Sequence, residues 1–347
     1  MKAVYRYGYE PRQYEFRDMP DPTCGPEDVI IEVKYAAICG SDVATYFNGG
    51  EKGGICIVGH EFAGTVVQVG SQVSDWKPGD RVVSDNTGHV CGKCHACTSG
   101  LFLNCMERVA LGYGMDGGFA KYVKIPGEIL RIHKWALMRI PDGVPYEYAA
   151  ILDPICNAYK AVAQESGLRP GESAIVFGPG PIGLLATQFC HIMGAKDVIM
   201  VGLSADKALR LDVAYEMGVT EFIASDAEDF VSRIHEVCGV EGADVAIDCA
   251  GAPSVLLQAI SGVRKDGTIV KVGASTAPLN FSLNDLTYRA QIVKGHHAYD
   301  VISWRNCLGL LSKNMLRLDP HILPLEQWER GIHMMRNREG IKILLQP

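Results

Sequence analysis

The sequence of residues 173–194 is SAIVFGPGPIGLLATQFCHIMG: a short apolar strand, a glycine-rich turn, and an apolar helix that ends at Gly194. The turn has the pattern G-x-G-x-x-G, in which the first glycine allows a tight turn and the second lets the backbone approach a pyrophosphate. The third allows close packing of helix and strand, and the helix N-terminus attracts phosphate charge. We expect five residues here to contact a dinucleotide: Gly178, Gly180, Pro181, Ile182 and Gly183.

Strand and helix patterns continue to alternate after this turn. DVIMV precedes ADKALRLDVAYEMG, TEFIAS precedes EDFVSRIHEVCG, and DVAIDCAG precedes PSVLLQAISGV. GTIVKVG and QIVKGHHA complete six candidate strands. Alternation at this pace predicts a doubly wound parallel sheet of the α/β class.

The end of the second strand bears on the choice of dinucleotide. NAD-binding proteins place an acidic residue there for the ribose hydroxyl, about twenty residues past the third glycine. Gly202 holds that position here, and it is followed by Ser204, Lys207 and Arg210. Without the carboxylate a 2′-phosphate is not repelled, and the basic side chains can pair with it. We therefore expect NADP ahead of NAD by a small margin; in the alternative, the basic residues are solvated helix residues and NAD binds through its other contacts.

Length and composition exclude several classes of protein. The chain has 347 residues, which suits two domains better than one. Its net charge of -7 argues against nucleic-acid binding. The longest charge-free stretch, Ser173–Ala195, contains three glycines and two prolines in its first half and does not suit a membrane helix. The N-terminal MKAVYRYGYEPRQYEF has no apolar signal-peptide core, so we expect a cytoplasmic protein.

Four of the twelve cysteines lie together in CGKCHACTSGLFLNC, with the spacing C-x2-C-x2-C-x7-C. They are Cys91, Cys94, Cys97 and Cys105. Four thiolates suit a closed structural zinc site. Iron–sulfur clusters use similar runs, but the last spacing and the lack of a proline after Cys105 favour zinc.

A second candidate metal site combines Cys39 with the pair His60 and Glu61. A thiolate, an imidazole and a carboxylate suit a catalytic zinc that keeps one position for water or substrate. The alternating Gly64, Val66 and Val69 after the pair predict a strand that would hold the site on a rigid scaffold.

These motifs together resemble the zinc-dependent medium-chain dehydrogenase/reductase superfamily over nearly the whole chain. The resemblance is carried by GHEFAGTVVQVGS, KPGDRV, the four-cysteine lobe, DGGFAKYV, GPGPIG and KILL, and it is strongest to the polyol (sorbitol-type) and threonine dehydrogenase branch. It implies a GroES-like, partly open β-barrel catalytic domain over residues 1–155 and 297–347. It also implies a Rossmann domain over residues 156–296, an active site in the cleft between the two, and a homo-oligomer, either tetramer or dimer.

The resemblance also implies the chemistry. One zinc ion, held by Cys39 and His60 with Glu61 or Asp153 completing the shell, would polarise a secondary alcohol. Ser41 would relay the proton, and the hydride would pass to NAD or NADP. We expect a polyol, sugar or sugar-alcohol phosphate as substrate. A threonine-like amino alcohol or a hydroxysteroid is the alternative, while retention of Cys39 and His60 disfavours a binding protein without turnover.

Two departures from the family pattern concern the surroundings of this site. Relatives commonly have a relay histidine where this chain has Ala44, so the proton would leave through Thr45, Tyr46 or water. The segment 127–143, GEILRIHKWALMRIPDG, is longer than usual. Four of its residues either bind an anionic substrate or form a solvated loop: Arg131, His133, Lys134 and Arg139.

Overall fold

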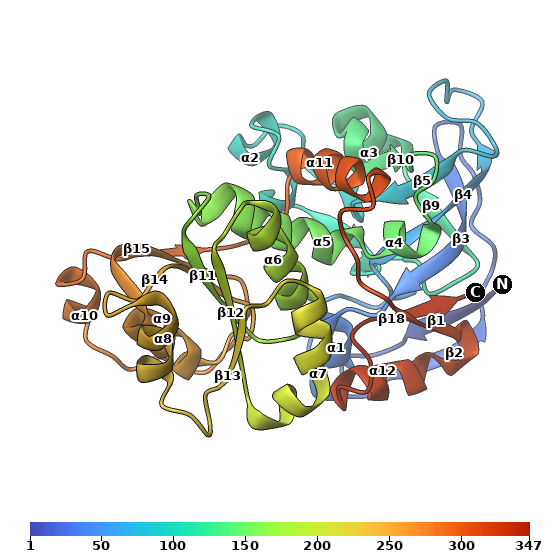
Figure 1. Cartoon of the computed structure of the whole chain (residues 1–347). Coiled ribbons are helices and arrows are strands. Elements are labelled where there is room, and N and C mark those ends of the chain that lie inside the picture. The colour runs from blue at the N-terminus through green and yellow to red at the C-terminus, as the bar shows by residue number, and fades with distance from the viewer. The chain divides into compact units, whose positions relative to one another are not determined.

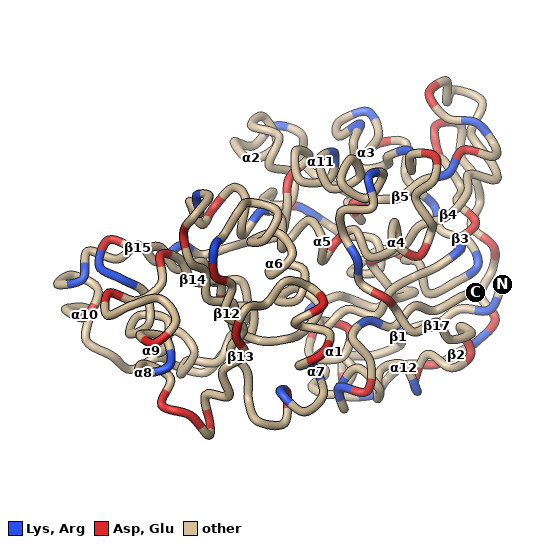
Figure 2. Tube along the Cα trace, in the orientation of Figure 1, with Lys and Arg blue, Asp and Glu red and all other residues tan.

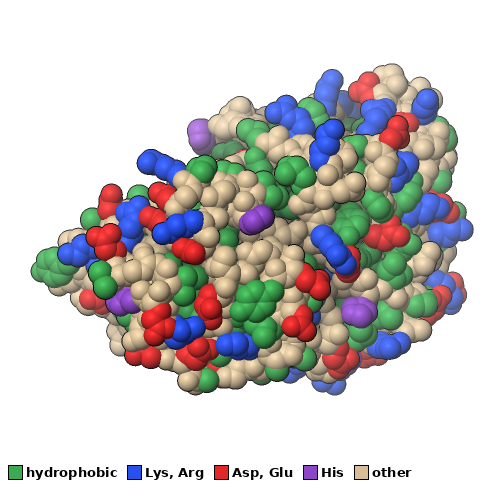
Figure 3. Space-filling model, viewed as in Figure 1, with side chains coloured by type: hydrophobic (Ala, Val, Ile, Leu, Met, Phe, Trp, Pro, Cys, Tyr) green, Lys and Arg blue, Asp and Glu red, His purple; other side chains and the backbone are tan.

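The structure is a computed structural model that describes all residues 1–347 and divides into two compact units (Figure 1). Unit 1 consists of Met1–Asp153 and Asp300–Pro347, and unit 2 of Pro154–Tyr299. No helix in the structure has the length and apolar character needed to cross a membrane. Acidic and basic residues are interspersed along both units (Figure 2). On the face shown in Figure 3, hydrophobic side chains likewise lie scattered among charged ones.

Unit 2 contains a six-stranded parallel sheet in the order β13-β12-β11-β14-β15-β16. Its strands are β11 (Ser173–Phe177), β12 (Asp197–Gly202), β13 (Glu221–Ala224), β14 (Ala243–Asp248), β15 (Val263–Lys271) and β16 (Ile292–Gly295). Numbered along the chain, this order is 3-2-1-4-5-6, the arrangement of dinucleotide-binding domains. The predicted doubly wound parallel sheet is therefore confirmed.

Helices cover both faces of this sheet. They are η3 (Lys160–Glu165, a π-helix), α6 (Pro181–Ile192), α7 (Ser204–Glu216), α8 (Phe230–Cys238), α9 (Pro253–Gly262) and α10 (Asn284–Thr287). Ile175 of β11 shares a core with Ile234 of α8 and Ile260 of α9. Because every residue of β11 is buried and α6 also packs on it, the turn between β11 and α6 is fixed on a rigid strand.

Unit 1 is built around a seven-stranded sheet in the order β10-β5-β4-β3-β18-β17, with β9 also paired to β3. All of its pairs are antiparallel except β17 with β18. Its strands are β3 (Val29–Ala37), β4 (Glu61–Val69), β5 (Arg81–Ser84), β9 (Tyr122–Ile125), β10 (Leu137–Arg139), β17 (His321–Pro324) and β18 (Ile343–Gln346). β1 (Lys2–Arg6) and β2 (Tyr14–Asp18) form a hairpin, and β6 (Thr87–His89), β7 (Val109–Leu111) and β8 (Gly114–Met115) form a small sheet.

The remaining helices of unit 1 are short. They are α1 (Gly40–Asn48), α2 (His95–Thr98), η1 (Phe102–Asn104), α3 (Gly127–Ile132), η2 (Lys134–Ala136), α4 (Tyr146–Ala150), α11 (Val301–Ser312), η4 (Leu325–Gln327) and α12 (Trp328–Arg336), and α5 (Leu152–Tyr159) continues into unit 2. Apolar residues of β3, β4 and β9 share one core with Trp328 and Ile332 of α12. This core fixes the ends of β3 and β4, where the candidate metal ligands lie.

Candidate active site

Cys39, His60 and Glu61 converge where β3 leads into α1 and where β4 begins. The antiparallel register pairs Ala37 with Glu61, so Cys39, two residues past β3, lies beside His60. The ligand atoms of the three side chains all lie within 4.8 Å of one another. A tetrahedral zinc with bonds of 2.0–2.3 Å keeps its ligands about 3.3–3.8 Å apart, so a small adjustment lets this group hold one ion.

Asp42 orients two of these ligands, a role that the sequence analysis missed. Its Oδ2 accepts a 2.9 Å hydrogen bond from the backbone N–H of Cys39, and its Oδ1 lies 3.4 Å from Nδ1 of His60. The Asp42 carboxylate thus attracts Nδ1, which makes no hydrogen bond within the chain, and Nε2 is left for a metal. Burial lowers the pKa of His60, but the negative charges of Asp42 and Cys39 outweigh it and raise that pKa well above its usual value.

Lys342 is the second missed residue. It is 2% exposed, lies just before β18, and contacts both carboxylate oxygens of Glu61 at 2.9 and 2.7 Å. Its Nζ also donates to the carbonyl oxygen of Ile38 at 2.9 Å. Burial raises the pKa of Glu61 and Lys342 opposes that rise. Glu61 is thus one of the three candidate metal ligands, and the buried ammonium group of Lys342 balances its negative charge.

Asp153 lies outside the ligand group. Its Oδ2 accepts a 3.1 Å hydrogen bond from Nδ2 of Asn86, and the group of metal-binding atoms contains Glu61 but not Asp153. The carboxylate is nevertheless close enough to repel Glu61 and so adds to the rise in the Glu61 pKa that burial causes. Asp153 is therefore a close neighbour of the group formed by Cys39, His60 and Glu61.

The candidate relay residues differ in availability. Ser41 Oγ lies 3.4 Å from Nε2 of His60, within reach of the position where a substrate would meet the metal. Thr45 donates to the backbone oxygen of Ser41 at 2.8 Å. The Tyr46 hydroxyl is buried and donates to Glu329, and burial raises its pKa to about 12. The Tyr46 hydroxyl is therefore engaged with Glu329, which argues against it as the next proton relay after Ser41.

The four cysteines of the lobe form a closed group. The Sγ atoms of Cys91 and Cys97 are 3.9 Å apart, and those of Cys91 and Cys105 are 3.6 Å apart. A tetrahedron with Zn–S bonds of 2.3 Å has edges of about 3.8 Å, so all four thiolates, including Cys94, fit one metal ion. A four-iron cluster would spread them over four metal atoms, farther apart. The geometry therefore favours the zinc interpretation over the iron–sulfur one.

The glycines of the turn after β11 have three different environments. Gly178 has φ +88°, which other residues rarely adopt. A Cβ at Gly183 would lie 1.9 Å from the carbonyl oxygen of Gly178, so helix and strand are in direct backbone contact. A Cβ at Gly180 would meet nothing within 4 Å, which leaves open space at the N-terminus of α6, where Pro181 and Ile182 begin the helix. An approaching pyrophosphate needs this combination.

Comparisons with known proteins agree with these sites. The zinc-binding dehydrogenase family model matches residues 181–313, and the alcohol dehydrogenase GroES-like domain model matches residues 25–135. The zinc-type alcohol dehydrogenase-like protein YdjL of Escherichia coli is 48% identical over 99% of this chain and 98% of its own. The chain belongs to the zinc-type medium-chain dehydrogenases.

Other members of this family have assigned activities. A sorbitol dehydrogenase of Halalkalibacterium halodurans is 35% identical over 100% of this chain and 99% of its own. An L-threonine 3-dehydrogenase of Bacillus licheniformis is 33% identical over 100% and 99%. The solved 2R,3R-butanediol dehydrogenase of Bacillus subtilis is 30% identical, covers 100% of this chain and 99% of its own, and has a TM-score of 0.86. The polyol and threonine branch and the GroES-like plus Rossmann architecture are thereby confirmed.

Similar solved structures hold different dinucleotides. A putative zinc-binding dehydrogenase of Sinorhizobium meliloti was solved with NADP (28% identity, 100% of this chain and 99% of that one, TM-score 0.86), and an alcohol dehydrogenase of Escherichia coli CFT073 with NADH (26%, 100% and 99%, 0.87). In the present chain Ser204 and Lys207, two of the residues expected to bind a 2′-phosphate, each contact a carboxylate instead. Asp226 accepts from both the N–H and the hydroxyl of Ser204, at 2.7 and 2.9 Å, and Lys207 lies 3.2 Å from Glu228. Gly202 ends β12, and Arg210 lies in α7.

Three of the four residues in segment 127–143 that were considered as ligands of an anionic substrate are paired with carboxylates in the structure. His133 is 1% exposed, and its Nε2 lies 2.6 Å from Oδ2 of Asp85, so its candidacy as an anion ligand is wrong. Arg131 pairs with Glu27. A run of basic residues in a sequence does not show which side chain points into the core. The partner of His133, Asp85, lies 48 positions away in the chain, so local sequence gave no sign of this contact.

Proposed function

We propose that this chain oxidises a secondary alcohol of a polyol, sugar or sugar-alcohol phosphate to a ketone, reversibly, with a nicotinamide dinucleotide as hydride acceptor. The observation that carries the proposal is the open group of Cys39, His60 and Glu61, because three protein ligands leave a position for substrate. A zinc ion bound there supplies a Lewis acid for the substrate oxygen, and the dinucleotide accepts the hydride.

The residues of the chain would prepare the site for this reaction. Asp42 holds His60 through Nδ1, and Lys342 balances the charge of Glu61. The Ser41 hydroxyl, 3.4 Å from Nε2 of His60, is placed to accept the proton that the alcohol loses. Each of these groups is held by contacts within unit 1, which favours a preorganised site.

Polar surroundings support a hydroxyl-rich substrate over a hydroxysteroid. Asn86 is 4% exposed and links Asp153 to Arg108 through its amide group. A buried polar network of this kind suits a polar substrate better than the apolar body of a hydroxysteroid. The sorbitol and butanediol dehydrogenases among the relatives support the same class.

We further propose that the chain prefers NAD to NADP. The Asp226 carboxylate occupies the N–H of Ser204 at the start of α7, the group that a 2′-phosphate would need, and it would repel that phosphate. Glu228 neutralises Lys207 in the same way. Asp226 thus compensates for the missing acidic residue at Gly202. Replacement Asp226→Asn is expected to tighten NADPH binding about tenfold relative to NADH, measured by titrating the fluorescence of the two reduced dinucleotides.

The test of the function is reduction of NAD and NADP by a panel of polyols, polyol phosphates, threonine and hydroxysteroids. We expect turnover with the polar secondary alcohols. Cys39→Ser should abolish turnover and leave dinucleotide binding intact, while Cys24→Ser, whose thiol contacts only backbone oxygens, should behave as wild type. Turnover in Cys39→Ser would refute the metal mechanism, and activity with threonine or a steroid alone would refute the substrate class.

We also propose a homo-oligomer. β16 lies at the edge of the parallel sheet, and its Ile292 and Val293 are 55% and 36% exposed. Exposed apolar edge strands are suited to pairing with another chain. Light scattering of the full chain is expected to give a multiple of the 37.7 kDa monomer mass, and a monomer would contradict the proposal.

A further inference from the structure

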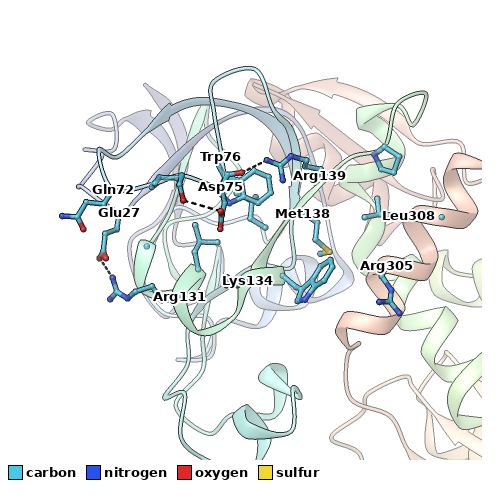
Figure 4. A pocket seen from close by; sticks show the side chains of 18 residues that line it. Glu27, Gln72, Asp75, Trp76, Arg131, Lys134, Met138, Arg139, Arg305 and Leu308 are labelled. Atoms are coloured by element: carbon cyan, nitrogen blue, oxygen red, sulfur yellow. Dashed lines mark hydrogen bonds and ion pairs between the residues drawn. The ribbon is translucent and has the colours of Figure 1, made fainter.

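Unit 1 contains a cavity of about 870 Å³ that no catalytic residue lines. It lies between three parts of unit 1: segment 127–139, the loop 72–76 and α11 (Figure 4). Its volume lies in the range of small-molecule sites. Cys39, His60 and Glu61 are absent from its walls, so it is not the substrate position at the metal group.

Apolar side chains form much of the wall. Trp76, Leu130, Trp135, Met138 and Leu308 line the cavity. Met138 and Leu308 are 4% and 7% exposed, whereas Trp135 is 45% exposed at the mouth. An aliphatic or aromatic body of a ligand would bury apolar surface here.

The cavity also has a surplus of positive charge. Arg131 pairs with Glu27, and Arg139 pairs with Asp80 at 3.1 Å while its guanidinium lies 4.3 Å from the centre of the Trp76 ring. In the view of Figure 4, Trp76 and Arg139 lie on one side of the cavity and Arg131 and Lys134 on the other.

Two further cations of the wall have no partner. Neither the Lys134 nor the Arg305 side chain forms an ion pair or a hydrogen bond in the structure. Lys134 belongs to η2 and Arg305 to α11, so the two unpaired cations approach the cavity from different elements. The carboxylate of Asp75 also lines the cavity without an ion pair, so the two unpaired cations leave the wall with an excess of positive charge that attracts a negatively charged group.

The wall that carries Lys134 is firmly anchored. The preceding residue, His133, is buried against Asp85, and its ring stacks on Phe102 with centroids 4.0 Å apart. Asp85 in turn accepts from the backbone N–H of Thr87 at 3.0 Å. These contacts fix the backbone at Lys134 and Trp135, so the cavity does not have to be assembled by its ligand.

We propose that this cavity binds a small amphipathic anion, with a carboxylate or phosphate group between Lys134 and Arg305 and an apolar body against Trp76, Trp135 and Met138. The site is separate from the proposed dehydrogenase site. It explains the length of segment 127–143, because α3, η2 and β10 of that segment supply the anchor, one cation and part of the apolar wall.

Tryptophan fluorescence can report directly on binding in this cavity. Two of its four tryptophans, Trp76 and Trp135, line the cavity, while Trp304 and Trp328 are 2% and 7% exposed and lie outside it. The zinc-loaded full chain is titrated with 4-phenylbutyrate, with octyl phosphate and with the uncharged 4-phenylbutyramide, in the absence of alcohol and dinucleotide. We expect saturable changes in tryptophan fluorescence with the two anions, and the tighter-binding anion is used for the variants.

The variants Lys134→Gln and Arg305→Gln are each expected to weaken binding of that anion about tenfold. Lys313→Gln is the matched control, because Lys313 is exposed just past the end of α11 and does not line the cavity. All three variants should keep wild-type dehydrogenase activity with an uncharged polyol, so failure of this proposal is distinguishable from failure of the proposed function.

Three results would overturn the proposal. The first is the absence of saturable binding by either anion, and the second is equal affinity for the amide and the acid. The third is a change of oligomeric state in Lys134→Gln or Arg305→Gln with no change in anion affinity, which would mean that a second copy of the chain covers this surface.

Discussion

Replacement of Lys342 by methionine tests the buried ion pair behind the metal group. Methionine keeps much of the side-chain length but removes the charge, so Glu61, 2% exposed, loses the cation that contacts both of its oxygens. The carbonyl oxygen of Ile38 loses its donor as well. Removing one partner of a buried pair costs about 3–5 kcal/mol, a large part of the 5–15 kcal/mol that typically stabilises a protein.

The free energy of unfolding is measured by urea denaturation of the zinc-loaded protein. We expect Lys342→Met to lose about 3–5 kcal/mol, and the double variant with Glu61→Gln to recover part of that loss, because no uncompensated charge then remains buried. Lys34→Met is the matched control. The Lys34–Glu32 pair has a similar short distance of 2.5 Å, but its side chains are 41% and 29% exposed, so its loss should cost less than about 1 kcal/mol.

Equal small losses in Lys342→Met and Lys34→Met would refute this reasoning. They would mean that water or rearrangement compensates Glu61 as easily as an exposed carboxylate. A full loss without any recovery in the double variant would show instead that the packing of the lysine stem, and not its charge, stabilises the site.

Other predictions address the remaining parts of the structure. Gly183→Ala should destabilise the fold by about 1–3 kcal/mol or more, because its Cβ would lie 1.9 Å from a carbonyl oxygen, whereas Gly180→Ala should melt like wild type and bind dinucleotide more weakly, as thermal melting and titration can check. Burial raises the pKa of Glu165, but the contact with His296 outweighs it and holds that pKa below its usual value. The pair therefore stabilises above the unfolded pKa of about 4.3 and is lost as pH falls through the folded value; from about pH 5 to 3, wild type should lose more stability than Glu165→Gln. Cys97→Ser should reduce bound zinc by one ion per chain in metal analysis, since it breaks a closed group of four ligands.

The local parts of this fold could be predicted because local pattern determines them. The expected strand 173–177 is β11, and the G-x-G-x-x-G turn falls between β11 and α6. The four cysteines lie within fifteen residues, so their spacing alone brings them together. Cys39 and His60 could be placed in one group because Gly59-His60-Glu61 is followed by the alternating pattern of a strand, whereas the residue types alone are weak evidence.

The surroundings of the metal group could not be predicted in the same way. Lys342 lies 281 positions from Glu61, and only the pairing of β18 with β3 brings them together. The opposite error occurred at His133, where a run of basic residues gave no sign that one member points into the core against Asp85. Long-range pairing and side-chain direction are properties of the packed structure, and a single sequence does not show them.

The charges around the open group explain why a divalent cation suits it. When ionised, Cys39, Asp42, Glu61 and Asp153 carry four negative charges, and Lys342 supplies one positive charge among these closely spaced groups. A surplus of three negative charges in a largely buried site is costly. Protonation is one way to relieve it, and the same negative charges raise the pKa of His60, although burial by itself lowers that pKa. A bound Zn²⁺ reduces the same surplus to one without protonating any ligand, so metal and proton compete for this site. Lys342 therefore balances the carboxylate of Glu61 while leaving enough negative charge to favour a metal ion.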